Sequence, residues 1–295
     1  MMMKNTRTKM MDKIKGKRKR RKSFRNMLIV LSTAAVILSA GYIVARLYDY
    51  YASARAYRTI EEMYVKHPLE TEDKEPSVTE SPAAPKEDRE IPVAMEPQGN
   101  AVPERMKVDW EGLRAANPDV VAWLYVPMAG ISYPVVQGGT NDEYLHKSFT
   151  GEYRYAGAIF LDSENAKSFT DRNTILYGHN MRDGSMFASL NSLSEEAFAK
   201  DPWIWVLTPE KDLLYKAFSY HTGETEGSSY TLFSPFARHK DFPEWLDALV
   251  KGSAFDSSLP GRYYERVLTL STCTSRSYTE RMILQGVLIK ELPES

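Results

Sequence analysis

The stretch RVLTLSTC (residues 266–273), followed by RMILQGVLIKEL (residues 281–292), holds the two strongest strand signals in this chain of 295 residues. Both are rich in branched apolar residues, and the seven-residue segment TSRSYTE separates them. We expect them to pair as a hairpin, which places Cys273 roughly opposite Arg281. Directly paired residues share a face, with Cβ atoms about 5 Å apart. The hairpin therefore predicts a thiol beside a guanidinium at the rim of a sheet.

The rest of the folded region carries further short strand signals and few long helices. Strands are expected at residues 120–126, 131–136, 158–161, 174–177, 203–208 and 213–221, and helices at 110–117, 142–147, 186–199 and 242–250. This order argues against a parallel βαβ fold. It favours a mainly β fold, a barrel or a sandwich, decorated by peripheral helices.

Charge is distributed unevenly along the chain. Residues 1–26 hold twelve Lys or Arg and one acid, which leaves 26 basic against 38 acidic residues in the remainder. A uniformly basic nucleic-acid binder is thereby excluded, and no nucleic-acid partner is expected. A single cysteine excludes a disulfide framework and any multi-cysteine metal site. The sequence shows no constellation of metal ligands in the folded region, and we expect no metal and no cofactor.

An uncharged run of nineteen residues, MLIVLSTAAVILSAGYIVA (27–45), follows the basic tail. As a helix it would be about 28 Å long, enough to cross the hydrocarbon of a bilayer. A cleaved signal peptide is the alternative, but signal cores are shorter, roughly 7–15 residues. The preceding basic residues favour a cytoplasmic N-terminus. We therefore expect a single-pass membrane protein whose folded domain is extracellular.

The domain organisation follows from these shifts in composition. Residues 1–26 form a basic cytoplasmic tail, 27–46 a transmembrane helix, 47–105 a juxtamembrane segment and stalk, and 106–295 the folded domain. Residues 67–103 contain seven of the sixteen prolines and many acids. Such a segment cannot bury enough apolar surface to fold, so we expect an extended stalk.

Cys273 is the first candidate for chemistry. A lone thiol outside the cell is either buried and inert or reactive. Its position at a strand end, before a polar loop, favours the reactive form. The neighbouring charge of Arg281 would favour the thiolate, and its donors suit a substrate carbonyl or a developing oxyanion.

His179 is the candidate acid or base among the five histidines. It follows the predicted strand at residues 174–177 in a Gly-His-Asn turn, where a rigid support can hold a functional side chain. An ordinary hydrogen-bonded histidine remains the alternative for this residue taken alone. Together, Cys273, His179 and Arg281 supply a nucleophile, an acid/base and an oxyanion donor.

Three ordered blocks resemble the sortases, the membrane-anchored cysteine transpeptidases of Gram-positive bacteria, and most of all class B. They are residues 117–149, residues 173–190 with His179, and residues 268–289 with the TLxTC cysteine at Cys273 and the arginine at Arg281. The predicted helix at 242–250 is similar to the extra helix of class B. The resemblance implies an eight-stranded sortase β-barrel over 106–295.

The resemblance also implies a reaction and its partners. Cys273 would cleave an Asn-Pro-x-Thr-type C-terminal sorting signal of a secreted protein after Thr, through a thioacyl-enzyme. His179 would transfer protons, and Arg281 would steady the oxyanion. The acceptor would be an amine of cell-wall precursor or a pilin lysine. The same analogy suggests a substrate groove lined by Asn141, Leu145, Tyr230 and Ser271.

Other functions stay open from the residues alone. A secreted cysteine protease would use the same pair with water as acceptor. An L,D-transpeptidase also runs histidine before cysteine, although its typical His-Gly-Cys cluster is absent around Cys273. A non-catalytic surface domain would keep Cys273 as a structural residue.

Overall fold

The computed structural model describes residues 2–67, 102, 104–225, 227–232, 241–256, 259, 265–274 and 279–294. The chain divides into two compact units, Met1–Ala52 and Ser53–Ser295. Helix α1 (Met2–Tyr64) forms the first unit and contributes its last turns to the second. Most of the expected stalk, residues 68–101 and 103, lies outside the described residues.

The first unit is a single helix with an apolar segment. Within the described residues, Phe24–Tyr64 is the one helical stretch long and apolar enough to cross a membrane, with a mean hydropathy of 2.3 over its most apolar window. It contains the uncharged run at residues 27–45, as expected from the sequence.

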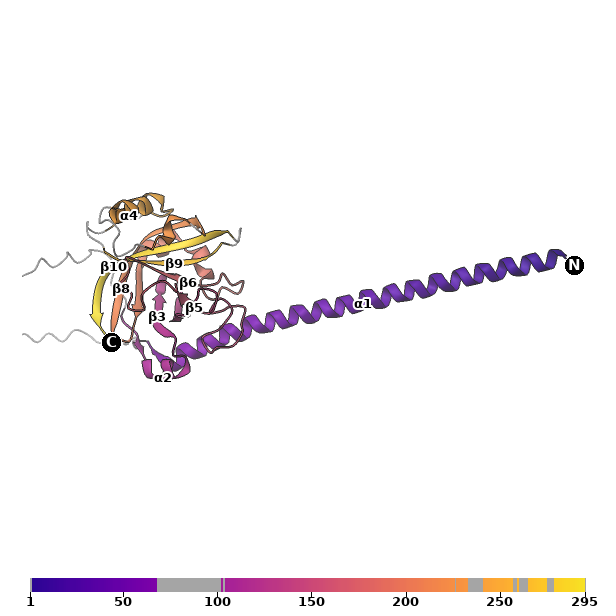
Figure 1. Ribbon diagram of the computed structural model, residues 1–295, viewed down its shortest axis with the longest axis horizontal. Helices are drawn as coiled ribbons and strands as arrows, with labels where there is room; N and C mark the ends of the chain where they lie inside the picture. The colour runs from indigo at the N-terminus through magenta and orange to yellow at the C-terminus, as the bar shows by residue number, and fades with distance from the viewer. Residues whose placement is uncertain are drawn as a thin grey trace, which may run out of the picture. The chain divides into compact units, whose positions relative to one another are not determined.

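The second unit is built on a closed eight-stranded barrel. Figure 1 labels several of its strands, among them β9 and β10. The strand order around the barrel is β10-β8-β7-β3-β4-β5-β6-β9. Its strands are β3 (Val120–Val126), β4 (Ile131–Val136), β5 (Ile159–Leu161), β6 (Asn173–Tyr177), β7 (Trp203–Leu207), β8 (Lys211–Glu224), β9 (Val267–Cys273) and β10 (Glu280–Pro293). The pairs β4–β5 and β6–β9 are parallel and the other described pairs are antiparallel. The expected mainly β barrel is confirmed.

Strand β9 is buried on both faces until its last residue. Because side chains alternate along a strand, Cys273 shares one face with Ser271, Thr269 and Val267. Val267 and Val287 pack against α4 (Asp241–Gly252), together with Phe242, Trp245, Leu246 and Leu249 of that helix. The alternate residues Leu268 and Leu270 are fully buried. Helix α4 therefore covers the face of β9 to which Cys273 belongs, at the opposite end of the strand.

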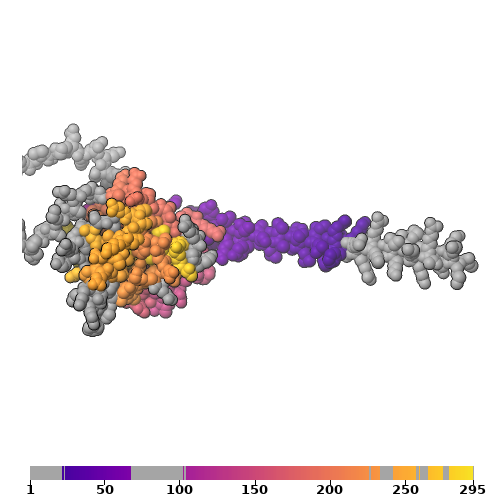
Figure 2. Space-filling view, turned by 90° about the horizontal axis from the view of Figure 1, so that it is seen from above, coloured from indigo at the N-terminus to yellow at the C-terminus, as the bar shows by residue number. Residues whose placement is uncertain are grey.

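Helix α4 forms where the spacing of Trp245, Leu246 and Leu249 predicted it. Its apolar face is buried against Phe218 of β8 and the valines of β9 and β10. Figure 1 shows α4 beside β9 and β10, and Figure 2 shows this region of the surface in orange. The prediction of a peripheral helix between the histidine and cysteine blocks is confirmed.

The second unit begins with the end of α1, followed by two short strands and a short helix. The end of α1 leads into β1 (Val65–Lys66), which pairs with β2 (Lys107–Val108). Next comes α2 (Trp110–Ala116), where the Asp109 side chain accepts from Gly112 N at 3.0 Å and Asn117 forms the C-cap. The cap and the end of α2 were expected, whereas the packing of residues 53–66 on the barrel was not predicted.

Two helix predictions need correction. Residues 142–147 form turns, because their carbonyls serve other partners: Tyr144 O accepts from Ala158 N and His146 O from Arg154 N. The expected helix at 186–199 is broken into η2 (Ala188–Ser192) and α3 (Glu195–Lys200). The break arises because Ser194 caps α3, accepting from Ala197 N.

Candidate active site

Sheet register places Cys273 directly opposite Arg281. Strands β9 and β10 pair antiparallel with Arg281 facing Cys273, as the hairpin predicted. Thr274 N donates to Glu280 O at 3.0 Å, which continues the pairing past the strand ends. Both side chains are partly exposed. The thiol and the guanidinium therefore share one face at the open end of the hairpin, where a substrate can reach them.

His179 lies on the other side of the same strand. The parallel pair β6–β9 aligns Tyr177 with Ser271, and Gly178 N donates to Ser271 O at 3.2 Å. Two residues further along each chain are His179, in the segment after β6, and Cys273, the last residue of β9. Strand β9 thus runs between the chain segments that carry His179 and Arg281. The geometry assembles the three residues singled out from the sequence around one strand end.

The ring of His179 is fixed by loop residues. Its Nε2 lies 2.7 Å from the carbonyl oxygen of Leu145. The ring stacks on His146, with centroids 5.4 Å apart, and on Tyr155, at 5.7 Å. Because a carbonyl only accepts, Nε2 carries the proton, and Nδ1 is the nitrogen available for proton exchange.

Burial lowers the pKa of His179 from its ordinary value of 6.5. The hydrogen bond to Leu145 opposes this shift in pKa, while the nearby charges of His146 and Arg281 add to it. Since a lower pKa favours the uncharged imidazole, His179 is set to accept a proton at neutral pH.

Three of the four expected groove residues, Asn141, Tyr230 and Ser271, are joined by a chain of contacts. Asn141 Nδ2 donates to Asp162 Oδ2 at 3.0 Å, and Tyr177 OH donates to the same oxygen at 2.8 Å. The Tyr177 ring is stacked on Tyr230, whose hydroxyl bonds Ser271 Oγ. Hydrogen bonds and one ring contact therefore connect Asn141 to Ser271, across the ends of β5, β6 and β9.

Burial separates these four residues by what they can do. Asn141, Leu145 and Tyr230 are partly exposed, whereas Ser271 is 1% exposed. Ser271 therefore supports Tyr230 from the buried side, and the Ser271 hydroxyl is engaged in that hydrogen bond. Leu145 contributes its carbonyl to His179. No feature of the sequence marks this carbonyl contact.

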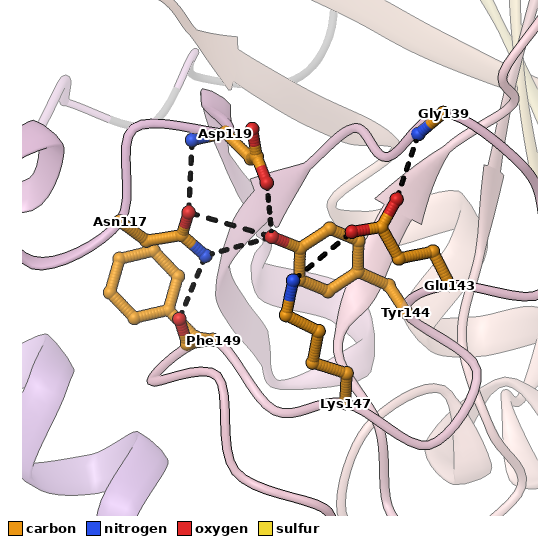
Figure 3. A network of polar contacts seen from close by, with 7 residues as sticks. All are labelled: Asn117, Asp119, Gly139, Glu143, Tyr144, Lys147 and Phe149. Carbon is orange, nitrogen blue, oxygen red and sulfur yellow. Dashed lines mark hydrogen bonds and ion pairs between the residues drawn. The ribbon is translucent and has the colours of Figure 1, made fainter.

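The loop that carries Leu145 is held by the polar network of Figure 3. Asn117 Nδ2 donates to Phe149 O at 2.8 Å, and Tyr144 OH donates to Asp119 at 2.7 Å. Glu143 accepts from Gly139 N at 2.9 Å and pairs with Lys147 at 3.1 Å. The contacts of Phe149 and Tyr144 tie the loop to residues just before β3, and the two contacts of Glu143 lie within the loop. The segment that carries the Leu145 carbonyl is therefore supported on both sides of Leu145.

Several residues of the site were not predicted from the sequence. Asn191 Nδ2 donates to the carbonyl oxygen of Cys273 at 3.2 Å. His146 and Tyr155 flank the ring of His179, and Asp162 joins Asn141 to Tyr177. Asp162 directly follows the strand predicted at residues 158–161, just as His179 follows the strand predicted at 174–177. This position at a strand end could have marked Asp162 as a site residue. The other residues come from loops whose course the sequence pattern does not define.

The described residues contain no group of three or more His, Cys, Asp or Glu that could hold a metal ion. A cavity of about 450 Å³ among them is lined by residues such as Arg114, Lys167 and Glu210, and none of the three candidate residues lines it.

Known proteins are similar to this chain in fold and in sequence. Residues 124–289 match the family model of the sortase domain. Sortase B of Listeria monocytogenes is 35% identical over 191 residues, which cover 60% of this chain and 72% of that protein. The X-ray structure of Clostridium perfringens sortase B matches with a TM-score of 0.55 at 30% identity, covering 62% of this chain and 100% of that one. A Staphylococcus aureus sortase B–substrate complex matches with a TM-score of 0.56 at 30% identity, covering 61% and 84%.

A closed barrel with a partly exposed cysteine between segments that carry a histidine and an arginine is an arrangement that suits a thiol enzyme. The chain belongs to the sortase family, and it is a sortase transpeptidase whose similar proteins are of the B type. The resemblance to class B found in the sequence is confirmed.

Proposed function

We propose that this sortase cleaves an Asn-Pro-x-Thr-type sorting signal after Thr and transfers the protein to an amine. The observation that carries the proposal is the register of β9, which places Cys273 opposite Arg281 and beside the chain that bears His179. This arrangement supplies a nucleophile, a proton carrier and an oxyanion donor at one accessible strand end.

The first half-reaction forms a thioester. His179 Nδ1 takes the thiol proton, and the Cys273 sulfur attacks the carbonyl carbon of the signal's Thr. The tetrahedral intermediate collapses as the peptide C–N bond breaks, and the imidazolium protonates the departing amine. A neutral His179 in the resting enzyme, which its lowered pKa favours, matches the first of these proton transfers.

The second half-reaction returns the enzyme to its resting state. An incoming amine loses a proton to His179 as it attacks the thioester carbonyl. The C–S bond then breaks, and the thiolate of Cys273 recovers its proton from the imidazolium. Each proton removed is returned, so the cycle needs no external acid or base.

Arg281 serves both half-reactions as the donor to the oxyanion. A guanidinium cannot act as a base at any relevant pH, but its planar set of N–H donors suits a carbonyl oxygen that gains negative charge. Its register position opposite Cys273 supports this role.

Two similar solved structures support a reaction that takes a substrate and an amine. Staphylococcus aureus sortase B has been solved as a substrate complex, and a sortase B crystal structure holds a complex with triglycine. We infer that the acceptor here is an amine of cell-wall precursor, with a pilin lysine as the alternative. Asn141, Leu145 and Tyr230 are the proposed groove residues, because they are partly exposed around the strand of Cys273.

We also propose that the N-terminus lies in the cytoplasm and the barrel lies outside. The twelve basic residues of 1–26 support this orientation, since positive segments remain on the cytoplasmic side. Residues 1–26, 27–46, 47–105 and 106–295 would then be tail, membrane span, juxtamembrane segment with stalk, and catalytic domain.

The test is product analysis with the full chain in detergent. A library of Asn-Pro-x-Thr-x peptides is incubated with varied amines, and products are identified by mass spectrometry. The proposal predicts peptides joined at Thr to the amine, with Cys273→Ala inactive. Hydrolysed peptide alone with every amine would favour a thiol protease, and cleavage by Cys273→Ala would reject the thiol mechanism.

A further inference from the structure

The last turns of α1 present a buried stripe to the barrel. Ser53, Tyr57 and Ile60 are 3%, 5% and 5% exposed, at the spacing that puts residues on one face of a helix. A buried tyrosine needs a partner for its hydroxyl. Tyr57 OH donates to Gly157 O at 2.6 Å and accepts from Phe149 N at 3.1 Å. Tyr57 therefore bonds two backbone groups nearly a hundred residues away.

Both partners belong to the segment that carries Leu145 and His146. Phe149 is held from the other side by Asn117, whose side chain donates to Phe149 O at 2.8 Å (Figure 3). Gly157 has φ +58°, and a Cβ built there would lie 2.4 Å from the Leu145 carbonyl oxygen. That oxygen is the partner of His179 Nε2. A short series of contacts thus connects Tyr57, through Gly157 and the Leu145 carbonyl, to the ring of His179.

A second series of contacts reaches the loop that follows His179. The ring of Tyr57 meets the ring of Tyr133 edge-on, with centroids 5.4 Å apart. Tyr133 OH accepts from Met186 N at 3.0 Å, where Met186 has the unusual φ of +58°. The next residue, Phe187, donates its N–H to His179 O at 3.0 Å. The side chain of Tyr57 therefore touches the supports of both loops around the histidine.

We propose that Tyr57 is a positioning residue for the active site: its hydroxyl and ring hold the two loops that orient His179. The proposal rests on the catalytic role proposed for His179 and extends it to a residue that belongs to the N-terminal helix. Tyr57 touches no reacting atom and acts only through Gly157, Phe149 and Tyr133.

The test is Tyr57→Phe in the full chain, which removes one oxygen and keeps the ring on Tyr133. Gly157 O and Phe149 N lose their buried partner, so the loop is expected to shift. A small displacement of a catalytic group can cost up to about 100-fold, and we expect kcat to fall about tenfold with little change in KM. Tyr64→Phe makes the same chemical change on the same helix, where the ring lies beside Gly112, and should keep wild-type kcat.

A second measurement follows His179 itself, by NMR of ¹³C-labelled histidine as a function of pH. The groups that face its ring are the Leu145 carbonyl, His146, Tyr155 and Arg281. Burial is the largest cause of its lowered pKa, so loosening the loop in Tyr57→Phe should raise the pKa towards 6.5.

The two measurements separate the possible failures. Wild-type kcat together with an unchanged His179 titration in Tyr57→Phe would overturn the positioning role. A lower melting temperature without either change would do the same, since it would show a purely structural contact. If the titration shifts but His179→Ala keeps full activity, the positioning of the ring stands and the proposed catalytic role of His179 fails.

Discussion

The β9–β10 hairpin and the loops around His179 hold their active-site residues in different ways. In the hairpin, seven consecutive residue pairs from Arg281–Cys273 to Val287–Val267 fix the position of the thiol and guanidinium. Around His179, single hydrogen bonds and ring contacts from residues such as Leu145, His146 and Tyr155 hold the imidazole. A ladder tolerates the loss of one contact, whereas a loop supported by a few contacts does not.

This difference suggests how the enzyme divides its tasks. The nucleophile and the oxyanion donor must keep a fixed mutual geometry, which a sheet provides. The proton carrier must serve a thiol, a leaving amine and an incoming amine in turn. Its support by loops is suited to small adjustments between those steps.

The largest loss of activity is expected for substitution of Cys273, at the end of the β9–β10 hairpin. Cys273→Ala should lower turnover by at least about 10⁴-fold, because no other nucleophile replaces the thiol. Thr272→Val is the matched control, since Thr272 is the neighbouring residue on the opposite face and its buried Oγ1 has no partner among the described residues. Steady-state rates should be near wild type for this control. An equal loss of turnover in both variants would mean that activity does not depend on the face of β9 that carries Cys273.

The next largest loss of activity is expected for His179, which is supported by loops. His179→Ala should lower turnover by about 10³-fold, within the usual range for general acid–base catalysis. The barrel should remain folded, because the ring packs on loop residues and not in the core of the sheet. Circular dichroism and a peptide-cleavage assay measure the two outcomes. A collapsed spectrum would make His179 a structural residue.

Arg281 tests the other side of the hairpin. Arg281→Ala should lower kcat by about 10²-fold, the typical cost of removing one oxyanion donor. Arg281→Lys should recover little of this, because an ammonium lacks the planar fork of the guanidinium. Near-wild-type rates for the lysine variant would show that positive charge alone is sufficient.

The smallest effect is on stability as a function of pH. Burial lowers the pKa of His179 and of His221 below 6.5, so the unfolded chain binds more protons than the folded one in acid. Stability from these residues is complete above pH 6.5 and is lost as the pH falls through their folded pKa values. We expect Tm to drop by a few degrees, about 2–4 °C, between neutral pH and pH about 5, and less in His221→Gln. An equal drop in that variant would exclude a contribution from His221.

The same contrast explains what could be predicted from the sequence. Periodicity and hairpin spacing were sufficient for β9, β10 and the facing pair of Cys273 and Arg281, because sheet register is a local property of two adjacent segments. His179 was found from its place after a strand. The closure of eight strands into a barrel came from the family resemblance and not from the pattern itself.

What the sequence did not show depends on contacts between distant loops. The turns at residues 142–147 replace an expected helix because their carbonyls pair with residues outside the segment, such as Arg154 and Ala158. The Leu145 carbonyl and the Tyr57 hydroxyl carry no side-chain pattern that marks them in advance. Backbone groups and packing of this kind become visible only in three dimensions.

The most direct measurement is intact-mass analysis of the full chain mixed with an Asn-Pro-x-Thr-x peptide, without added amine. The protein should gain the mass of the peptide fragment that ends at Thr, less one water for the thioester bond, and proteolytic mapping should locate the adduct on Cys273. It should form much more slowly in His179→Ala. An adduct on any other residue, or cleavage with none formed, would contradict a thioacyl mechanism built on the β9 strand end.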